Sequence, residues 1–220
     1  EEMDRSMAEE ANAEEDIIFD ARLGWYFVPG SFKVHLIVET DIAAQRIFND
    51  KRGKSEGYSS VEEAKDSILR RKASESDRYM QKYGIDCCNM DNYDLVIDTS
   101  YTSPENITEL IFDKLGLWKE GKTFDRIWLS PKSLFPSTDP NRFGGRITVI
   151  DDGSFTTGDS EAGLFIPGLK VDGRYYVIAG SRIISEAAAK DVTLLPVRII
   201  AKDADRLPRG VTAREYVEQF

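Results

Sequence analysis

The stretch DIIFDARLGWYFVPGSFKVHLIVET, residues 16–40, decides the fold class. It holds two runs of bulky and β-branched residues, DIIFDA (16–21) and FKVHLIVE (32–39), with a short loop between them. Continuous apolar runs of this length are typical of strands that are buried on both faces of a parallel sheet. We therefore predict an α/β core. Arg22 directly follows the first predicted strand, at the edge where open α/β sheets present ligands.

The remainder of the first half alternates helices with a further strand. Asp41 can cap a helix over residues 41–49, and Ser60 with Glu63 forms the pattern of a capping box for a long helix. We expect that helix to end at Gly84, where a left-handed residue is favoured. A core strand follows at YDLVIDTS (93–100), and then a helix that begins at Ser103-Pro104 and closes at Gly116.

The second half changes character near residue 120, where short strands come close together. RITVIDDGSFTT (146–157) and LKVDGRYYVI (169–178) both carry Asp-Gly turns between strand-like runs, which is typical of hairpins. LLPVRIIAK (194–202) predicts a further strand, and Thr212 with Glu215 predicts the start of a last helix. We therefore predict an α/β domain over residues 1–119 and a smaller α+β domain over residues 120–220.

Composition excludes several classes of protein. The 220 residues carry a formal net charge of −10, which argues against a protein that coats nucleic acid by charge alone. The sequence has no apolar run of about 18 residues, so we expect no membrane span. Two adjacent cysteines, Cys87 and Cys88, rarely form a disulfide, and a reducing cytoplasm is the setting that they favour.

No metal site is predicted. The two thiols and the single histidine, His35, are too few for a four-ligand zinc site, and we expect His35 to be a packed strand residue. Asp98 ends a predicted strand. Three further aspartates fall in predicted turns, where aspartate is favoured for local geometry: Asp151, Asp152 and Asp172.

Six arginines of the first half are placed as a phosphate clamp requires. A guanidinium offers a planar fork that matches phosphate oxygens. These arginines follow a strand, lie in one loop or lie along helices: Arg22, Arg46, Arg52, Arg70, Arg71 and Arg78. The alternative is that the helix arginines form solvated ion pairs with nearby acids: Glu62, Glu63, Glu75 and Asp77. Position alone leaves both interpretations open.

The amino-acid sequence of the first half resembles those of the cytidylate kinases, in particular the short archaeal-type branch. The strings DARLGWY and RYMQKYGID, and then NYDLVIDTS with a following SPE, occur in the order found in the C-terminal portion of that family, over residues 10 to 117 or so. The resemblance implies a P-loop fold that binds CMP or dCMP together with ATP and Mg²⁺. It also implies an arginine-bearing lid and in-line phosphoryl transfer by positioning and charge neutralisation.

The resemblance also implies roles for individual residues. Arg22 of ARLGW matches the arginine that contacts the monophosphate. Arg70 and Arg71 match catalytic lid arginines that reach the transferred phosphoryl group. Arg78 and Asp86 of RYMQKYGID match positions that help to seat the acceptor nucleotide in the family, and Arg46 matches the arginine near the ATP side.

The P-loop that such kinases require is absent from this sequence. No GxxxxGK[ST] occurs anywhere in the 220 residues, although this motif is what cradles the donor phosphates. We therefore expect the chain taken alone to be inactive, as either a fragment of a longer kinase or a remnant that has lost catalysis. We favour the fragment, because residues 1–15 read as the end of a helix with no cap or initiator methionine.

The second half resembles the ParB/sulfiredoxin-like domain over residues 125 to 205 or so. The strings are DRIWLSPKSLFPSTD (125–139) and GRYYVIAGSRIISEAAAKDVTLLPVRIIAKD (173–203). The turn at Gly180, Ser181 and Arg182 would place a guanidinium beside free N–H groups at a helix N-terminus, which is a possible anion site. An ordinary turn with Arg182 on the surface is an equal alternative.

This second region departs from the family pattern in two ways. Ile183, Ile184 and Ser185 stand where CTP-binding members carry further arginines. Ser181 stands where sulfiredoxins place a cysteine, and no histidine accompanies it, so reductase chemistry is not expected.

The leading hypothesis is part of a cytidylate kinase-like transferase, acting on CMP or dCMP, fused to a ParB-like domain. The first alternative is a non-catalytic nucleotide-binding or DNA-partitioning-type adaptor, although the net charge disfavours nucleic acid as a partner. A structural interaction module is the second alternative. A P-loop motif upstream of this sequence would favour the enzyme.

Overall fold

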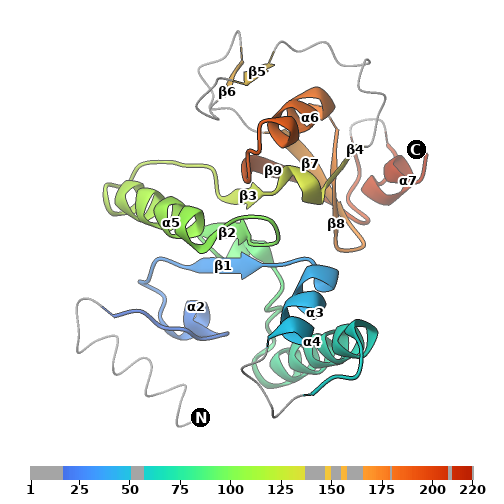
Figure 1. Ribbon diagram of the computed structural model, residues 1–220. Coiled ribbons are helices and arrows are strands. Elements are labelled where there is room, and N and C mark those ends of the chain that lie inside the picture. Colours follow the sequence, from blue (N-terminus) through green and yellow to red (C-terminus); the bar gives the residue numbers. More distant parts are fainter. Residues whose placement is uncertain are drawn as a thin grey trace. The chain divides into compact units, whose positions relative to one another are not determined.

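The computed structural model describes residues 17–50, 57–136, 147–149, 155–157, 166–178, 180–207 and 210–219 (Figure 1). The chain divides into two compact units, Glu1–Val96 and Ile97–Phe220. The division falls inside strand β2 (Leu95–Asp98), earlier than the sequence boundary placed near residue 120. Both units combine strands and helices, so the prediction of a mixed α/β fold is confirmed at that level.

The first predicted strand does not form. Residues 17–21 lie in no strand; the side chain of Ile18 is 96% exposed, while Ile17 and Phe19 are partly buried. The elements that follow are two short ones, α2 (Gly24–Phe27) and β1 (Val34–Ile37), and then two helices, α3 (Thr40–Asn49) and α4 (Val61–Tyr83). A short 3₁₀ turn, Met90–Asn92, precedes β2.

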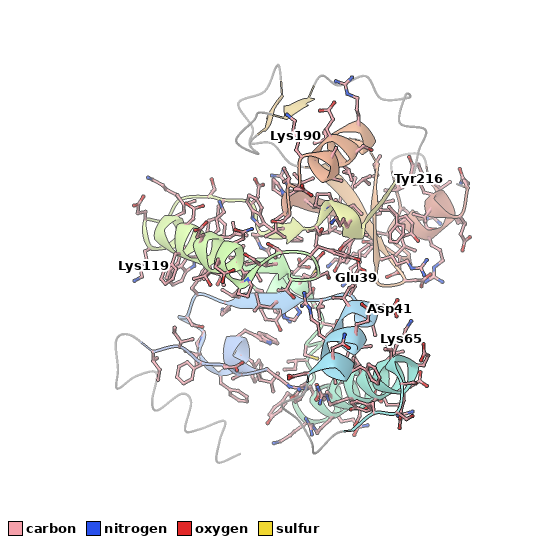
Figure 2. All side chains as sticks on the ribbon, viewed as in Figure 1. Glu39, Asp41, Lys65, Lys119, Lys190 and Tyr216 are labelled. Atoms are coloured by element: carbon pink, nitrogen blue, oxygen red, sulfur yellow. The ribbon has the colours of Figure 1, made fainter. Side chains whose placement is uncertain are left out.

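Helices α3 and α4 pack against each other through small and apolar side chains (Figure 1). Ala44 of α3 and Ala64 of α4 are fully buried, and Ile68 lies one turn further along the same face of α4. Asp41 does not cap α3 as predicted, because the helix begins one residue earlier, at Thr40. The carboxylate of Asp41 instead binds Lys65 of α4 at 2.5 Å (Figure 2).

The ends of α4 follow the sequence prediction closely. The Ser60 hydroxyl accepts a hydrogen bond from the N–H of Glu63 at 3.1 Å. The Glu63 carboxylate accepts from the N–H and hydroxyl of Ser59 rather than from the cap residue itself, so only one half of the capping box forms. Gly84 ends the helix in the left-handed region, with φ of 67°.

Aromatic side chains hold α2 and β1 within the first unit. Tyr83, the last residue of α4, lies against Tyr26 and Phe27 of α2, with ring centroids 5.9 and 5.6 Å apart. His35 of β1 stacks on Tyr93 at 4.3 Å, which confirms the prediction of a packed strand histidine.

The second unit is built on strands of mixed direction. Its helices are α5 (Pro104–Lys119), α6 (Ser181–Ala189) and α7 (Ala213–Val217). Strands pair in the order β3-β9-β7-β8-β4, with bounds Ile127–Leu129, Leu195–Lys202, Ile166–Val171, Arg174–Val177 and Leu134–Pro136. A 3₁₀ turn, Pro131–Ser133, links β3 to β4, while β5 (Ile147–Val149) and β6 (Phe155–Thr157) form a separate antiparallel pair.

Both predicted hairpins form, since β5 pairs with β6 and β7 with β8 in antiparallel fashion. The turn residues Asp151 and Asp152 lie outside the described part of the chain. Helix α5 differs from prediction because it passes through Gly116 and ends three residues later, at Lys119. Gly121 then supplies the left-handed conformation, with φ of 67°.

Close packing in the second unit depends on a glycine in β7. Strand β7 runs parallel to β9, and its register shifts between Gly168 and Leu169. A Cβ at Gly168 would lie 2.9 Å from a methyl group of Val197, so a larger residue here would require the Val197 side chain or one of the two strands to shift. The apolar core beside this point contains Leu169, Val171, Ala201 and Ala213.

An ion cluster ties α7 to two turns of the second unit. The Arg214 guanidinium binds Asp172, in the β7–β8 turn, at 2.5 Å and Asp203 at 3.4 Å. Both aspartates have positive φ, of 49° and 28°. The N–H of Asp172, and to a lesser extent Arg214, holds the pKa of Asp203 below its usual range.

Among the described helices, none has a stretch both long and apolar enough to cross a bilayer.

Two glycine substitutions should shift stability in opposite directions. Gly84→Ala places a Cβ at positive φ and should destabilise the first unit by about 1 kcal/mol. Gly116→Ala removes backbone freedom inside α5, where nothing lies within 4 Å of the new Cβ, and should stabilise the second unit by about 1 kcal/mol. Urea denaturation followed by circular dichroism measures both changes. A stabilising Gly84→Ala would contradict the left-handed cap.

The Asp203→Asn substitution should lower stability at neutral pH but not at acid pH. A carboxylate whose pKa is lowered by folding contributes stability above its unfolded value of about 3.9 and loses that contribution as pH falls through the folded value. The difference in Tm between the wild type and Asp203→Asn should therefore shrink between pH 7 and pH 3. A difference that is the same at both pH values would show that the charge of Asp203 contributes nothing.

Candidate functional site

The C-terminal half of α4 carries a face of alternating charge. Seven residues separate Arg71 from Arg78, which is close to two helical turns, and Glu75 lies between them at i+4 and i−3. The same stripe of the helix carries Ala64 and Ile68 further toward its N-terminus, where it packs on α3. Helix α4 therefore uses one face for packing in its first half and for charge in its second half.

Arg22 joins this face from a separate segment. Its guanidinium forms an ion pair with Glu75, and its side chain is 53% exposed while that of Glu75 is 21% exposed. Arg22 thus contacts Glu75 directly, while Arg71 and Arg78 lie on the same side of α4 as Glu75 by helix spacing. We refer to Arg22, Arg71, Glu75 and Arg78 as the arginine face.

The arginines of the arginine face are accessible to solvent. Arg71 and Arg78 are both exposed, and the Arg78 guanidinium lies over the ring of Tyr79, 5.1 Å from its centroid. Its Nη2 is also 3.4 Å from the Tyr79 hydroxyl. This side of α4 therefore carries more arginines than the one carboxylate of Glu75 can neutralise, and guanidinium groups suit an anion with several oxygens.

The other predicted kinase residues lie away from this face. Arg70 lies roughly 100° around the helix from Arg71. Hydrogen bonds from Ser59 hold the pKa of Glu63 low, and the charge of Arg70 is a smaller cause of the same shift. Arg46 lies on the exposed side of α3, Asp86 accepts a hydrogen bond from the N–H of Cys88 at 2.8 Å, and Arg52 falls outside the described residues.

Metal ligands are not grouped in the described residues. No set of three or more histidine, cysteine, aspartate or glutamate side chains is placed there to hold an ion. The arginine face contains a single carboxylate that is already paired.

The second predicted site lies at the start of α6, and its anion-binding role stays a prediction. Gly180 precedes α6 with φ of 99°, which suits glycine. The Arg182 guanidinium binds Glu186 on the same helix at 3.2 Å and is 76% exposed, while the side chain of Ser181 lies outside the described part of the structure. Ile183 and Ile184, which stand where arginines were expected for CTP, are buried and pack in the interior.

Asp98 ends β2, as the sequence predicted, but its hydrogen-bonded cluster was not predicted. Asp98 is only 2% exposed and accepts four hydrogen bonds within the second unit. The donors are the N–H and hydroxyl of Ser100, at 2.9 and 2.5 Å, the N–H of Ser130 at 3.2 Å and the hydroxyl of Ser133 at 2.5 Å. Burial, and to a lesser degree the charge of Asp98, raises the pKa of Tyr175.

This Asp98 cluster is a structural tie rather than a ligand site. All four donors are neutral, and both serine hydroxyls are themselves buried, so no open position remains for a metal or a substrate. One local pattern could have predicted part of this cluster. An aspartate side chain often accepts a hydrogen bond from the backbone N–H two residues later, and Ser100 stands two residues after Asp98.

A shallow hollow lies between α5 and the segment that precedes β9. Its volume is about 590 Å³, and it is lined by residues of both signs of charge beside an indole ring: Asn106, Glu109, Leu110, Asp113, Trp128 and Lys190–Leu194. One face of the Trp128 ring is taken by Lys114, whose Nζ lies 4.9 Å from the centroid. None of the predicted site residues lines it.

Residues 1–101 match the model of the Cytidylate kinase-like family. The match covers the N-terminal part of the chain, and ends earlier than the resemblance over residues 10 to 117. It includes the whole arginine face and Asp86. The correspondence with the C-terminal portion of the kinases, and the roles of single arginines, stay predictions.

Curated relatives agree with this match. A cytidylate kinase of Methanobrevibacter smithii is 39% identical over 114 residues, which is 52% of this chain and 63% of the relative. A cytidylate kinase of Methanosphaera stadtmanae is 33% identical, over 50% of this chain and 60% of the relative. An S-adenosylmethionine-dependent nucleotide dehydratase of Lacinutrix mariniflava is 34% identical, over 51% of this chain and 22% of the relative.

The chain spans about three fifths of the length of the cytidylate kinases that it matches. No solved structure matches it. The ParB-like resemblance of the second half is therefore not shown by any comparison, and it remains a proposal.

Removing the charge of Asp98 should destabilise the second unit. In Asp98→Asn one acceptor oxygen becomes an NH₂ group that faces donors, and leaving buried donors unpaired costs about 1–3 kcal/mol. Urea denaturation measures the change. Asp191→Asn is the matched control, because Asp191 is exposed at φ of 54°, a conformation that asparagine also tolerates. Equal stability of both variants would rule out a structural role for the Asp98 cluster.

Proposed function

We propose that the first unit is the acceptor-binding and lid part of a cytidylate kinase-like phosphotransferase. Its substrates would be CMP or dCMP and ATP, and the arginine face would hold phosphate oxygens. The observation that carries this proposal is the ion pair between Arg22, from a separate segment, and Glu75, on the side of α4 that also bears Arg71 and Arg78, inside the region that matches the family. Guanidinium groups that converge from two segments can bind one phosphate from two sides.

Glu75 gives the arginine face a second property. In the absence of a nucleotide it neutralises Arg22, so a phosphate must displace or share this carboxylate in order to bind. Each charge-assisted hydrogen bond contributes about 1.5–3 kcal/mol to the binding of a phosphate, and breaking the Arg22–Glu75 ion pair cancels part of that contribution. Arg22 would then act on the monophosphate, and Arg71 with Arg70 would close over the transferred group as lid arginines.

ATP would supply the phosphoryl group, and Mg²⁺ would neutralise charge between its phosphates. The described residues hold no carboxylate cluster for this ion. What the residues of this chain contribute is positioning: Arg78 and Asp86 would seat the acceptor nucleotide, and Arg46 would lie toward the donor.

For the second half we propose a ParB/sulfiredoxin-like α+β module, with Gly180, Ser181 and Arg182 as its anion-binding turn. The left-handed Gly180 at the start of α6 supports this assignment. We also propose a reducing, cytoplasmic setting, which the two adjacent thiols favour.

Titration calorimetry with CMP on the full chain tests the arginine face. Arg22→Ala should weaken CMP binding by about tenfold, because one charge-assisted contact is lost. Glu75→Gln should tighten binding, since the competing carboxylate is removed while the helix and the arginines remain. A change of opposite sign in these two variants is expected only if the ion pair and the phosphate share Arg22.

Arg182→Ala is the matched control, because Arg182 is also an exposed arginine in an ion pair with a glutamate, but lies on α6. It should leave CMP affinity unchanged. Equal losses in Arg22→Ala and Arg182→Ala would mean that the acceptor site is misassigned. Stabilisation by CTP that Arg182→Ala abolishes, with no response to CMP, would favour the nucleotide-binding adaptor instead.

A further inference from the structure

Two cysteine thiols stand side by side on the turn that follows α4. The Sγ atoms of Cys87 and Cys88 are 4.0 Å apart; Cys88 is exposed and Cys87 is partly exposed. These are the only cysteines of the chain. The kinase proposal uses neither of them.

Hydrogen bonds on both sides hold this turn in place. Asp86 accepts from the N–H of Cys88 at 2.8 Å, and the Asn92 side-chain amide donates to the carbonyl of Asp86 at 2.9 Å. The hydroxyl of Tyr93 donates to the carbonyl of Cys87 at 3.1 Å. The backbone is thus held at the Asp86 carbonyl and at the peptide group that joins the two cysteines, so one anchored turn presents both thiols together and less backbone freedom is lost when they bind a ligand.

We propose that Cys87 and Cys88 form a chelating dithiol site for trivalent arsenic, in the form of arsenous acid. Thiolate sulfur is the protein ligand that soft, thiophilic centres prefer. A zinc site would need four ligands, and no group of three candidate ligands is placed to hold a metal anywhere in the described residues. Trivalent arsenic needs only the two sulfurs, because a hydroxyl group completes its three bonds.

The binding step exchanges ligands and changes no oxidation state. Two S–H bonds and two As–O bonds break, two S–As bonds form, and the thiol protons leave with the displaced hydroxyl groups as two molecules of water. The third hydroxyl group stays on arsenic. No oxidant, reductant or further reactant takes part.

A disulfide is the less suitable product of these two thiols. Sulfur atoms in a disulfide are about 2.0 Å apart, and the Cα atoms that it joins are usually separated by at least about 4.4 Å. Consecutive Cα atoms across a trans peptide are only about 3.8 Å apart, and no cis peptide occurs in the described residues. An arsenic atom placed between the sulfurs lets them stay further apart than a direct S–S bond does.

Ordinary thiol reagents should react slowly at Cys87. Burial, with smaller contributions from Cys88 and Asp86, raises the pKa of the Cys87 thiol to about 11, so little thiolate is present at neutral pH. If the protein binds arsenic readily but reacts slowly with iodoacetamide, the preference for arsenic would therefore come from the pairing of the two thiols and not from the reactivity of either one.

The test is native mass spectrometry of the intact folded chain, titrated with sodium arsenite. We expect one arsenic atom per chain and the loss of both titratable thiols. Cys87→Ser and Cys88→Ser each keep one thiol in place, and each should bind arsenite about 100-fold more weakly, because the second bond of a chelate forms at high effective concentration. Circular dichroism confirms that each variant is folded.

Three results would overturn the proposal. The folded wild type could retain no arsenic at arsenite concentrations that a free dithiol captures. Either serine variant could bind arsenite as tightly as the wild type. Arsenic could be retained only in urea, which would show that the folded turn prevents chelation. None of these results depends on whether the chain binds CMP.

Discussion

Glu75 lies between two arginines on one face of α4 and also binds Arg22, which comes from a different segment. This carboxylate therefore offsets positive charge at the point where Arg22 meets α4, on the side of the helix that also bears Arg71 and Arg78. In the proposed function a phosphate bound by Arg22 displaces or shares Glu75. Binding by the arginine face then becomes an exchange of one anion for another.

Local chemistry made much of the first unit predictable from sequence. Ser60 and Gly84 mark the two ends of α4, because a hydroxyl cap and a left-handed glycine act on the residues next to them. The strand at DIIFDA failed for the opposite reason, since a strand exists only where another strand accepts its hydrogen bonds. The Arg22–Glu75 pair could not be predicted, because its partners are 53 residues apart and only the packed fold brings them together.

The second unit shows the same contrast. Asp-Gly turns specified both hairpins, whereas Gly116 did not end α5, because an interior glycine weakens a helix without breaking it. The Asp98 cluster depends on serines more than thirty residues away, and no local pattern reveals that Ser130 and Ser133 turn toward it. Buried polar groups of this kind are satisfied by whichever chain segments the fold supplies.

The position of Asp98 has a practical consequence. The match to the kinase family model ends at residue 101, yet two of the four groups that satisfy this carboxylate come from Ser130 and Ser133. A shorter polypeptide cut at residue 101 would keep Asp98 but lose both of these serines. The end of the family match therefore falls inside this hydrogen-bonded cluster and does not coincide with the division between the two compact units, which lies between Val96 and Ile97.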